Sequence, residues 1–138
     1  MIRVETTEFE PYANSIKAIR FEVFVDEQSV PPELEIDGLD PECLHALAFN
    51  EDTPIGTGRL LKDGHIGRVA VLASYRNQGI GTLIMKSLIN AARNRSFQSV
   101  ILSSQAQAIP FYEQLDFQTQ GPIYQEAGID HIDMVLKL

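Results

Sequence analysis

The sequence is poor in cysteine and contains no tryptophan and no long hydrophobic run. Its single cysteine, Cys43, excludes an intrachain disulfide, and we expect it to be a small buried packing residue at the start of an apolar strand. No apolar run approaches the ~20 residues that a membrane-spanning helix needs. Residues 1–5 lack the apolar core of a secretion signal. We therefore expect no membrane association and a reducing, cytoplasmic setting.

Basic side chains are also scarce, with 11 Lys and Arg against 19 Asp and Glu and a net charge of −8. This balance argues against nucleic-acid binding. The charges are unevenly spread: residues 1–50 contain three basic and eleven acidic side chains, whereas residues 59–95 contain seven basic and one acidic. The division favours a polyanionic cofactor near the second segment and a cationic substrate near the first. The alternative is chance clustering on solvated faces.

The length of 138 residues suits one domain with a real core, so we expect a single domain over residues 1–138. Hydrophobic periodicity predicts an α/β fold with a mixed sheet (α+β): an antiparallel N-terminal meander, a strand–helix–strand crossover and a C-terminal hairpin. The crossover makes its two strands parallel neighbours. The predicted strands are 2–5, 43–49, 55–61, 65–72, 99–104, 117–124 and 131–138, and the predicted helices are 12–27, 79–94 and 107–115.

A phosphate-binding pattern lies in the crossover, where the strand at 65–72 is followed by Arg76-Asn77-Gln78-Gly79-Ile80-Gly81 and then by an amphipathic helix. The first N–H groups of a helix have no intrahelical partner, and the helix dipole is positive there. Glycines give a ligand access to those N–H groups. The segment therefore predicts an anion site best suited to phosphate, against the alternative of a plain tight turn.

Two familiar nucleotide motifs do not fit this segment. A P-loop requires Lys-Ser or Lys-Thr after its last glycine, and Gly81 is followed by Thr82-Leu83. A dinucleotide fingerprint requires a third small residue where Ile84 stands, and an acid after the strand at 99–104, which instead ends in Ser104-Gln105.

The Arg-x-x-Gly-x-Gly pattern resembles the coenzyme A pyrophosphate loop of the GNAT superfamily of N-acetyltransferases. The segment from Ala108 to Phe117 is similar to the second signature of that superfamily, Ala-x-x-Phe-Tyr-x-x-Leu-Gly-Phe. Further segments resemble the ElaA/YjcF-like branch: Phe21 to Gln28, Glu35-x-Asp37-x-x-Asp40, His45, and Glu126 to Met134. The resemblance implies one GNAT-like acyl-CoA N-acyltransferase domain, in which the two central parallel strands splay apart.

Two positions depart from the family pattern. Asn77 and Asp116 stand where glycine is common. Asn and Asp are the other residue types that best tolerate a left-handed backbone, so we expect both turns to form.

The resemblance implies transfer of an acetyl group from acetyl-CoA to a primary amine of a small molecule or peptide, by direct attack in a ternary complex. It implies that Tyr112 is the general acid and that the N–H of Val71 or Leu72 stabilises the oxyanion; otherwise Tyr112 is a packed aromatic residue. The coenzyme A contacts it implies are Val69, Ala70, Val71, Arg76, Asn77, Gln78, Gly79, Ile80, Gly81, Thr82, Gln105 and Phe111. The rival function is a non-catalytic acyl-CoA-binding regulatory module.

The acceptor side of the site is less determined. Residues 33–42 carry five acids and no base, which predicts either a solvated loop or one wall of a pocket that attracts an amine. The general base stays open among Glu22, Glu27, Glu35 and Asp37, and no metal site is expected because the calcium-loop spacing is missing. His45 could instead be a core residue, and Glu126 with His131 could instead stabilise the hairpin. A homodimer through that hairpin is a further possibility. Candidate substrate contacts are Glu27, Glu35, Asp37, His45, Glu126 and His131.

Overall fold

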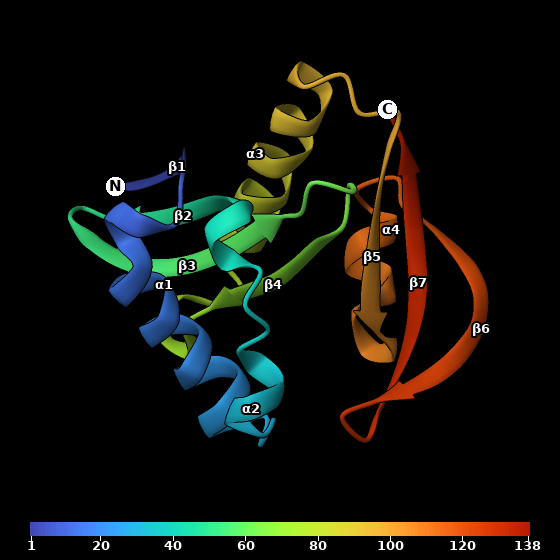
Figure 1. The fold of residues 1–138 in the computed structure, drawn as a ribbon, viewed down its shortest axis with the longest axis horizontal. Helices are drawn as coiled ribbons and strands as arrows, with labels where there is room; N and C mark the ends of the chain where they lie inside the picture. The colour runs from blue at the N-terminus through green and yellow to red at the C-terminus, as the bar shows by residue number, and fades with distance from the viewer.

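Two separate sheets form the molecule in a computed structural model that describes residues 1–138 (Figure 1). The first sheet is an antiparallel meander in the order β1-β2-β3-β4, and the second is antiparallel in the order β5-β7-β6. The strands are β1 (Ile2–Thr7), β2 (Leu44–Asn50), β3 (Thr53–Leu60), β4 (Ile66–Val71), β5 (Ser99–Gln105), β6 (Gln118–Glu126) and β7 (Ile129–Lys137). The predicted meander, mixed α/β class and closing hairpin are confirmed.

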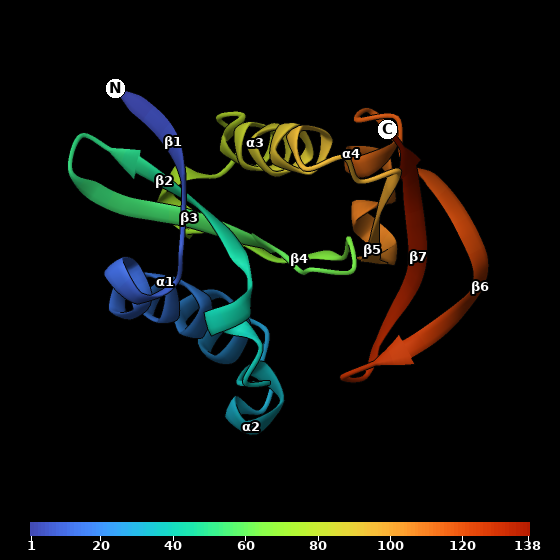
Figure 2. The same cartoon turned by 45° about the horizontal axis from the view of Figure 1, so that its top comes forward.

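Helices cover both faces of the first sheet, and one helix packs on the second (Figure 2). The predicted helix at 12–27 forms, but its second half, Phe21–Glu27, is π-helical, a geometry that is often found at functional sites. No helix is both long and apolar enough to cross a bilayer. The helices are α1 (Ala13–Arg20) and α2 (Pro32–Glu35) on one face, α3 (Ile80–Asn94) on the other, and α4 (Ile109–Glu113) beside β5 and β6.

Two glycines of β3 let α3 approach the first sheet closely. A Cβ atom on Gly58 would lie 2.9 Å from Cγ2 of Ile84 and 3.1 Å from Cδ1 of Leu88, and one on Gly56 would lie 3.0 Å from Cδ1 of Ile84. Ile84 and Leu88 belong to the main core and are fully buried. The Gly-Thr-Gly run in β3 is therefore a packing requirement of the core. Cys43 is buried, as the sequence predicts.

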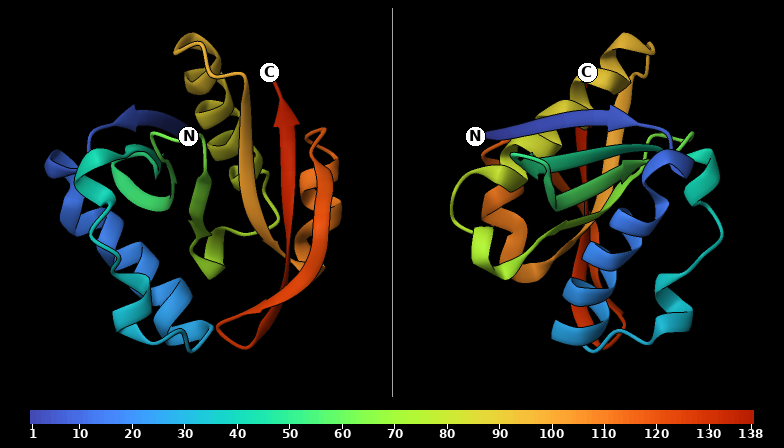
Figure 3. Two further views of the ribbon diagram at one scale, coloured as in Figure 1. Left: turned by 45° about the vertical axis from the view of Figure 1, so that its right-hand side comes forward. Right: turned by 90° about the vertical axis from the view of Figure 1, so that its left-hand side faces the viewer.

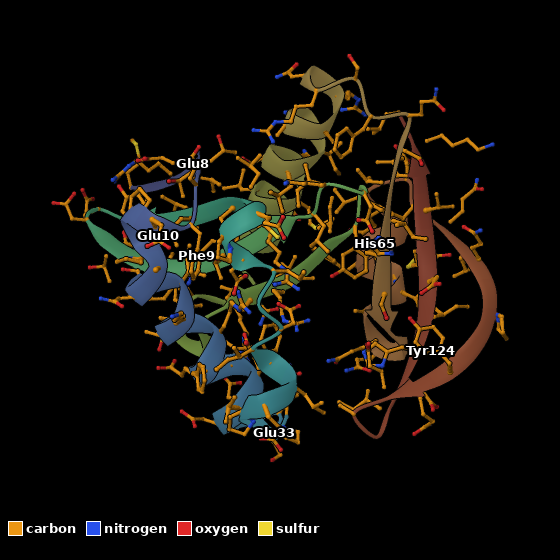
Figure 4. All side chains as sticks on the ribbon, in the orientation of Figure 1. Glu8, Phe9, Glu10, Glu33, His65 and Tyr124 are labelled. Atoms are coloured by element: carbon orange, nitrogen blue, oxygen red, sulfur yellow. The ribbon has the colours of Figure 1, made fainter.

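The two central strands touch at one end only. His65 and Ile101 form a single parallel bridge, where the Ile101 N–H donates to the Gly64 carbonyl at 3.1 Å. Beyond this bridge β4 pairs only with β3, and β5 pairs only with β7. Figure 3 shows the two sheets diverging, and Figure 4 labels His65 beside the point where they meet. The expected splay is present, and it leaves one backbone edge of β4 without a partner strand.

The left-handed turns expected from the sequence are confirmed. Asn77 has φ 63° and Asp116 has φ 72°. Gly79, the residue that precedes α3, has φ 80°. The chain therefore enters α3 through two left-handed residues, Asn77 and Gly79.

Candidate active site

The first turn of α3 presents free backbone donors. No side chain caps the helix, and its first intrahelical bond runs from the Leu83 N–H to the Gly79 carbonyl at 3.1 Å. The N–H groups of Ile80, Gly81 and Thr82 therefore have no intrahelical partner, and the positive end of the helix dipole lies at the same place. Gly81 faces Phe111 of α4, since a Cβ at this position would lie 3.4 Å from the aromatic ring. A larger residue would fill the space in front of these donors.

These donors line a cavity of about 570 Å³, which we call the loop cavity. Of the coenzyme A contacts expected from the sequence, all but two line it. Gln78 is solvent-exposed and lies outside the cavity lining, and Gln105 lines a second cavity. The loop cavity is lined by Val23, Gln28, Val69, Ala70, Val71, Tyr75, Arg76, Asn77, Gly79, Ile80, Gly81, Thr82 and Phe111.

Arg76 and Glu27 form an ion pair at the rim of the loop cavity. The Arg76 guanidinium donates from Nη1 and Nη2 to the two Glu27 oxygens at 2.8 and 2.9 Å, and from Nε to the Val71 carbonyl at 2.9 Å. Both side chains are more than one-third exposed, so the pair adds little to stability. The pair orients the guanidinium at the mouth of the loop cavity. It also engages both oxygens of the Glu27 carboxylate.

The unpaired edge of β4 exposes the Val71 backbone. The Leu72 N–H donates to the Ile55 carbonyl at 2.9 Å, and Val71 pairs with Gly56. Because successive residues of an antiparallel strand direct their N–H and C=O groups to opposite sides, those of Val71 point away from β3. The bond from Arg76 to the Val71 carbonyl agrees with this orientation. Leu72 is therefore removed as an oxyanion donor, since its N–H is committed within the sheet, and Val71 remains.

The second cavity, of about 620 Å³, lies between β4 and β5 and is called here the acceptor cavity. Val69 and Gln28 line both cavities, so the two adjoin at these residues. Ser103 and Gln105 line it from β5, and the Gln105 amide donates to the Gln28 side-chain oxygen at 3.0 Å. Tyr112 lines it from α4. Residues 66–69 of β4 line the acceptor cavity and residues 69–71 line the loop cavity, so the two cavities lie in succession along β4.

Tyr112 is held by aromatic contacts. Its ring packs edge-on against Phe111 at 4.9 Å and Phe117 at 6.0 Å between centroids. Burial raises the pKa of Tyr112 to about 12, and no hydrogen bond contributes to this shift. The hydroxyl therefore stays protonated at neutral pH and can donate a hydrogen bond into the acceptor cavity.

Arginines neutralise the central acids of the 33–42 segment. Arg20 pairs with both oxygens of Glu35, one of them at 2.9 Å from Nη2, and Arg59 pairs with Asp37. Asp40 accepts from Nη1 of Arg20 at 2.7 Å and from Nη1 of Arg59 at 2.9 Å. Glu33 and Glu42 are exposed and have no arginine partner, although Glu42 lies 3.4 Å from Nζ of Lys62, and Figure 4 shows Glu33 at the tip of α2. Most of the segment is solvent-exposed, as a solvated loop would be, but its three central acids are paired with arginines and do not form a wall of free carboxylates.

This pairing shifts the titration of the acids. Hydrogen bonds from Arg59 hold the pKa of Asp37 far below its usual range. Burial of Asp40 acts in the opposite direction, but the bonds from Arg20 and Arg59 outweigh it and lower the pKa of Asp40. Both carboxylates are therefore ionised at neutral pH, with their charges compensated by the arginines.

His45 lies away from both cavities, contrary to its expected place in the substrate pocket. Its side chain is fully buried, its Nε2 lies 3.0 Å from the Asp40 carbonyl oxygen, and its ring lies 5.2 Å from that of Phe9. Burial lowers the pKa of His45, so the ring is neutral. The fold makes it a core residue because β2 is the second strand from the edge and is covered by α1.

His131 and Glu126 both line the acceptor cavity. His131 Nδ1 lies 2.8 Å from the Ile129 carbonyl oxygen, and Nε2 lies 3.4 Å from Oε2 of Glu126. Because a carbonyl only accepts, Nδ1 carries the hydrogen, and Nε2 of the neutral ring is an acceptor that can receive a proton or a hydrogen bond from a ligand; it bonds Glu126 only when the ring is protonated. Tyr124, labelled in Figure 4 on the second sheet, stacks on the His131 ring at 6.1 Å.

Two cavity residues, Gln28 and Arg68, were not assigned to the site by sequence reasoning. Gln28 stands in the segment that resembles the family, but its position at the junction of the cavities depends on the π-helical turn that precedes it. Arg68 stands on a β-bulge of β4 that only the register between β3 and β4 reveals.

Comparison with known proteins agrees with this geometry. Residues 10–138 match the acetyltransferase (GNAT) domain family. The chain is 40% identical over 121 residues to YjcF of Bacillus subtilis, an N-acetyltransferase by its description, covering 85% of this chain and 86% of YjcF.

Two crystal structures are also similar. An acyl-CoA N-acyltransferase from Pseudomonas aeruginosa has a TM-score of 0.88 and 29% identity, covering 98% of this chain and 99% of that protein. Escherichia coli ElaA has a TM-score of 0.88 and 27% identity, with the same coverage. The chain therefore belongs to the GNAT family of acetyltransferases, within its ElaA/YjcF-like branch, and is an acyltransferase.

Proposed function

We propose that the enzyme transfers an acetyl group from acetyl-CoA to a primary amine by direct attack in a ternary complex. The observation that carries this proposal is that the two cavities adjoin at Val69 and Gln28, which line both. A donor in the loop cavity and an acceptor in the acceptor cavity can be bound together and meet along β4. The rival function, a non-catalytic acyl-CoA-binding module, gains no support from the comparisons.

The loop cavity fits coenzyme A in its chemistry. The free N–H groups of Ile80, Gly81 and Thr82 suit the pyrophosphate, and Arg76 supplies a positive charge at the rim. The unpaired edge of β4 at Val69 and Val71 suits the amides of the pantetheine arm, which would pair with it as a short strand does. When bound, the thioester supplies an acetyl group that is electrophilic at its carbonyl carbon.

Val71 and Tyr112 would stabilise the charges that develop during transfer. The Val71 N–H faces the cavity and can donate to the carbonyl oxygen as it becomes negative. Tyr112 can donate to the departing sulfur. Complete proton transfer from a phenol with a pKa of about 12 to a thiolate of pKa ~8.5 is uphill by about 5 kcal/mol. We therefore assign Tyr112 as a hydrogen-bond donor to the departing sulfur. The proton that the thiolate finally gains comes from the acceptor ammonium.

The acceptor amine must lose a proton before it attacks. Arginines engage Glu27, Glu35 and Asp37, and His45 is buried away from the cavities. The Glu126–His131 pair remains on the acceptor side, with Nε2 of His131 unbonded to any backbone group. We assign His131 as the proton acceptor, oriented by the Ile129 carbonyl. Replacing His131 with Gln should lower kcat for thiol release and leave acetyl-CoA affinity unchanged.

The test is release of free thiol from acetyl-CoA over a panel of amino acids, polyamines, aminoglycosides and peptide N-termini. Release that depends on an amine and on both substrates together supports the proposal. If no amine of the panel causes thiol release while calorimetry shows that acetyl-CoA still binds, the result would favour the non-catalytic module instead.

A pair of variants tests the phosphate site at the start of α3. Gly81→Val places a branched side chain against Phe111 and should abolish acetyl-CoA binding. Gly67→Val is the matched control for acetyl-CoA binding alone, because a Cβ at Gly67 meets nothing within 4 Å and Gly67 lines the acceptor cavity but not the loop cavity. Unchanged affinity in the Gly81 variant would reject the assignment of the phosphate site.

A further inference from the structure

Arg68 occupies a β-bulge at the wall of the acceptor cavity. Thr57 of β3 pairs with Ala70 of β4, and Arg59 pairs with Gly67. Between these pairs, Gly58 of β3 faces two residues of β4, Arg68 and Val69. Arg68 has φ 52°, a left-handed conformation that is uncommon for a non-glycine residue. The bulge directs this side chain into the acceptor cavity next to Val69, where the two cavities meet.

Arg68 has the weakest pairing in the arginine cluster, although Nε of Arg59 is also buried without a partner. Arg20 and Arg59 each bond two carboxylates. The hydrogen bonds of Arg68 all come from Nη2 and are long: 3.3 Å to the Leu34 carbonyl, 3.2 Å to the Glu35 carbonyl and 3.4 Å to Asp37. Its Nε is buried without a partner. Nη1 has no partner either and is not sealed from solvent, because the side chain is 29% exposed.

The electrostatic surroundings agree with the incomplete pairing. Burial, and then the positive charge of Arg59, lower the pKa of Arg68, although the group remains charged at neutral pH. The carboxylates nearby are already shared with Arg20 and Arg59. This wall of the cavity therefore offers an unsatisfied cation to a ligand, and not the free acids that would attract a polyamine.

We propose that the acceptor carries a carboxylate as well as its amine, and that Arg68 binds this carboxylate at the wall of the acceptor cavity. Arginine presents a planar fork of donors that matches a carboxylate. The inference rests on the proposed function and specifies its acceptor as an amino acid or a compound of that kind.

The rest of the cavity favours an apolar body for this acceptor. Twelve of its 23 lining residues are hydrophobic. Leu34 and Leu39 line the cavity and are 57% and 39% exposed, so their apolar surfaces stand open beside Arg68. An amino acid with an apolar side chain would cover these surfaces while its carboxylate reaches the arginine and its amine faces β4.

The experiment compares kcat/KM for amino acids with that for the amines that lack only the carboxylate, such as phenylalanine with 2-phenylethylamine and leucine with 3-methylbutylamine. A third arm uses the phosphonate analogue of phenylalanine. In the native enzyme the carboxylate should raise kcat/KM roughly ten- to hundredfold for at least one pair, as expected for a charged hydrogen-bonded contact. This measurement needs no variant.

Arg68→Gln should bring the ratio within a pair close to one, mainly by slowing the amino acid, and Arg68→Lys should give an intermediate ratio. The change in ratio cancels any difference in amine basicity between the two compounds. Arg95→Gln removes an exposed arginine at the end of α3, far from both cavities, and should keep the native ratio. Unchanged acetyl-CoA affinity and melting temperature show that each variant is folded.

Three results would overturn the inference. Equal kcat/KM for both members of every pair in the native enzyme would show that no carboxylate contact contributes. The proposed acetyl transfer to amines would still stand. An Arg68→Gln variant that is folded and keeps the native ratio would likewise refute the contact with Arg68, and a preference for the phosphonate would assign a different anion. No transfer to any amine at all, with or without a carboxylate, would instead refute the proposed function together with this inference.

Discussion

Removal of the Tyr112 hydroxyl tests the chemistry in the acceptor cavity. Tyr112→Phe deletes one oxygen and keeps the edge-on contacts with Phe111 and Phe117. Because no hydrogen bond to the hydroxyl contributes to its titration, the variant should leave no protein group unpaired. Stability should change by less than about 0.5 kcal/mol, as for substitutions that break no buried network.

The expected kinetic effect follows from the role assigned to the hydroxyl. A hydrogen bond to a charged group contributes about 1.5–3 kcal/mol. If it forms only as sulfur gains negative charge, its loss should lower kcat about 10- to 150-fold and leave acetyl-CoA affinity unchanged. Since the pKa of Tyr112 is about 12, its ionisation should not produce a limb in the pH–rate profile between pH 6 and 10.

The assay is steady-state thiol release, combined with calorimetric binding of acetyl-CoA and thermal unfolding. Tyr12→Phe is a matched control, because Tyr12 packs against Phe49 of β2 and lines neither cavity. A native kcat in the Tyr112 variant would refute the donor role. A loss of acetyl-CoA affinity equal to the loss of kcat/KM would show that the hydroxyl acts in binding instead.

Three further predictions concern packing, buried charge and the rim of the loop cavity. Gly58→Ala should lower the free energy of unfolding by about 1–3 kcal/mol because its Cβ would overlap Ile84, whereas Gly67→Ala, with open space around it, should be close to neutral in urea titrations. Asp40→Asn should cost about 3–5 kcal/mol of stability, because it removes the carboxylate shared by two buried arginines; a cost below ~1 kcal/mol would contradict this account. The pKa of Asp40 is lower in the folded state than in the unfolded state. Its contribution to stability is therefore fully present above the unfolded pKa of ~3.9 and is lost as the pH falls through the lower folded value. Below about pH 4, the melting temperature of Asp40→Asn should therefore depend less on pH than that of the native protein. Arg76→Ala should weaken acetyl-CoA binding about tenfold with a reduced salt dependence, as expected for loss of one charged phosphate contact, and an unchanged affinity would place Arg76 outside the site.

The parts of the fold that the sequence predicts are those set by short-range patterns. Periodicity locates α3, and the Asp-Gly and Ala-Gly pairs mark the turns of the meander and the hairpin. The phosphate loop is predictable for the same reason, since Arg76, Gly79 and Gly81 are close in sequence and the free amides follow from the helix start itself.

Features that depend on long-range contacts were not predictable. The acids at 35, 37 and 40 look free in the sequence, because their partners Arg20 and Arg59 lie 15 to 22 residues away on α1 and β3. The commitment of the Leu72 N–H depends on its pairing with Ile55, and the orientation of Arg68 depends on a one-residue bulge. Each requires the strand register, which periodicity alone does not determine.

The central claim is that the amides at the start of α3 and the free edge of β4 together bind acetyl-CoA. The most direct test is an amide NMR titration of the ¹⁵N-labelled protein with coenzyme A. Our account predicts large shifts for the N–H groups of Ile80, Gly81, Thr82 and Val71, and a small shift for Leu72, which is already bonded to Ile55. Saturable binding that leaves residues 79–82 unshifted would contradict it.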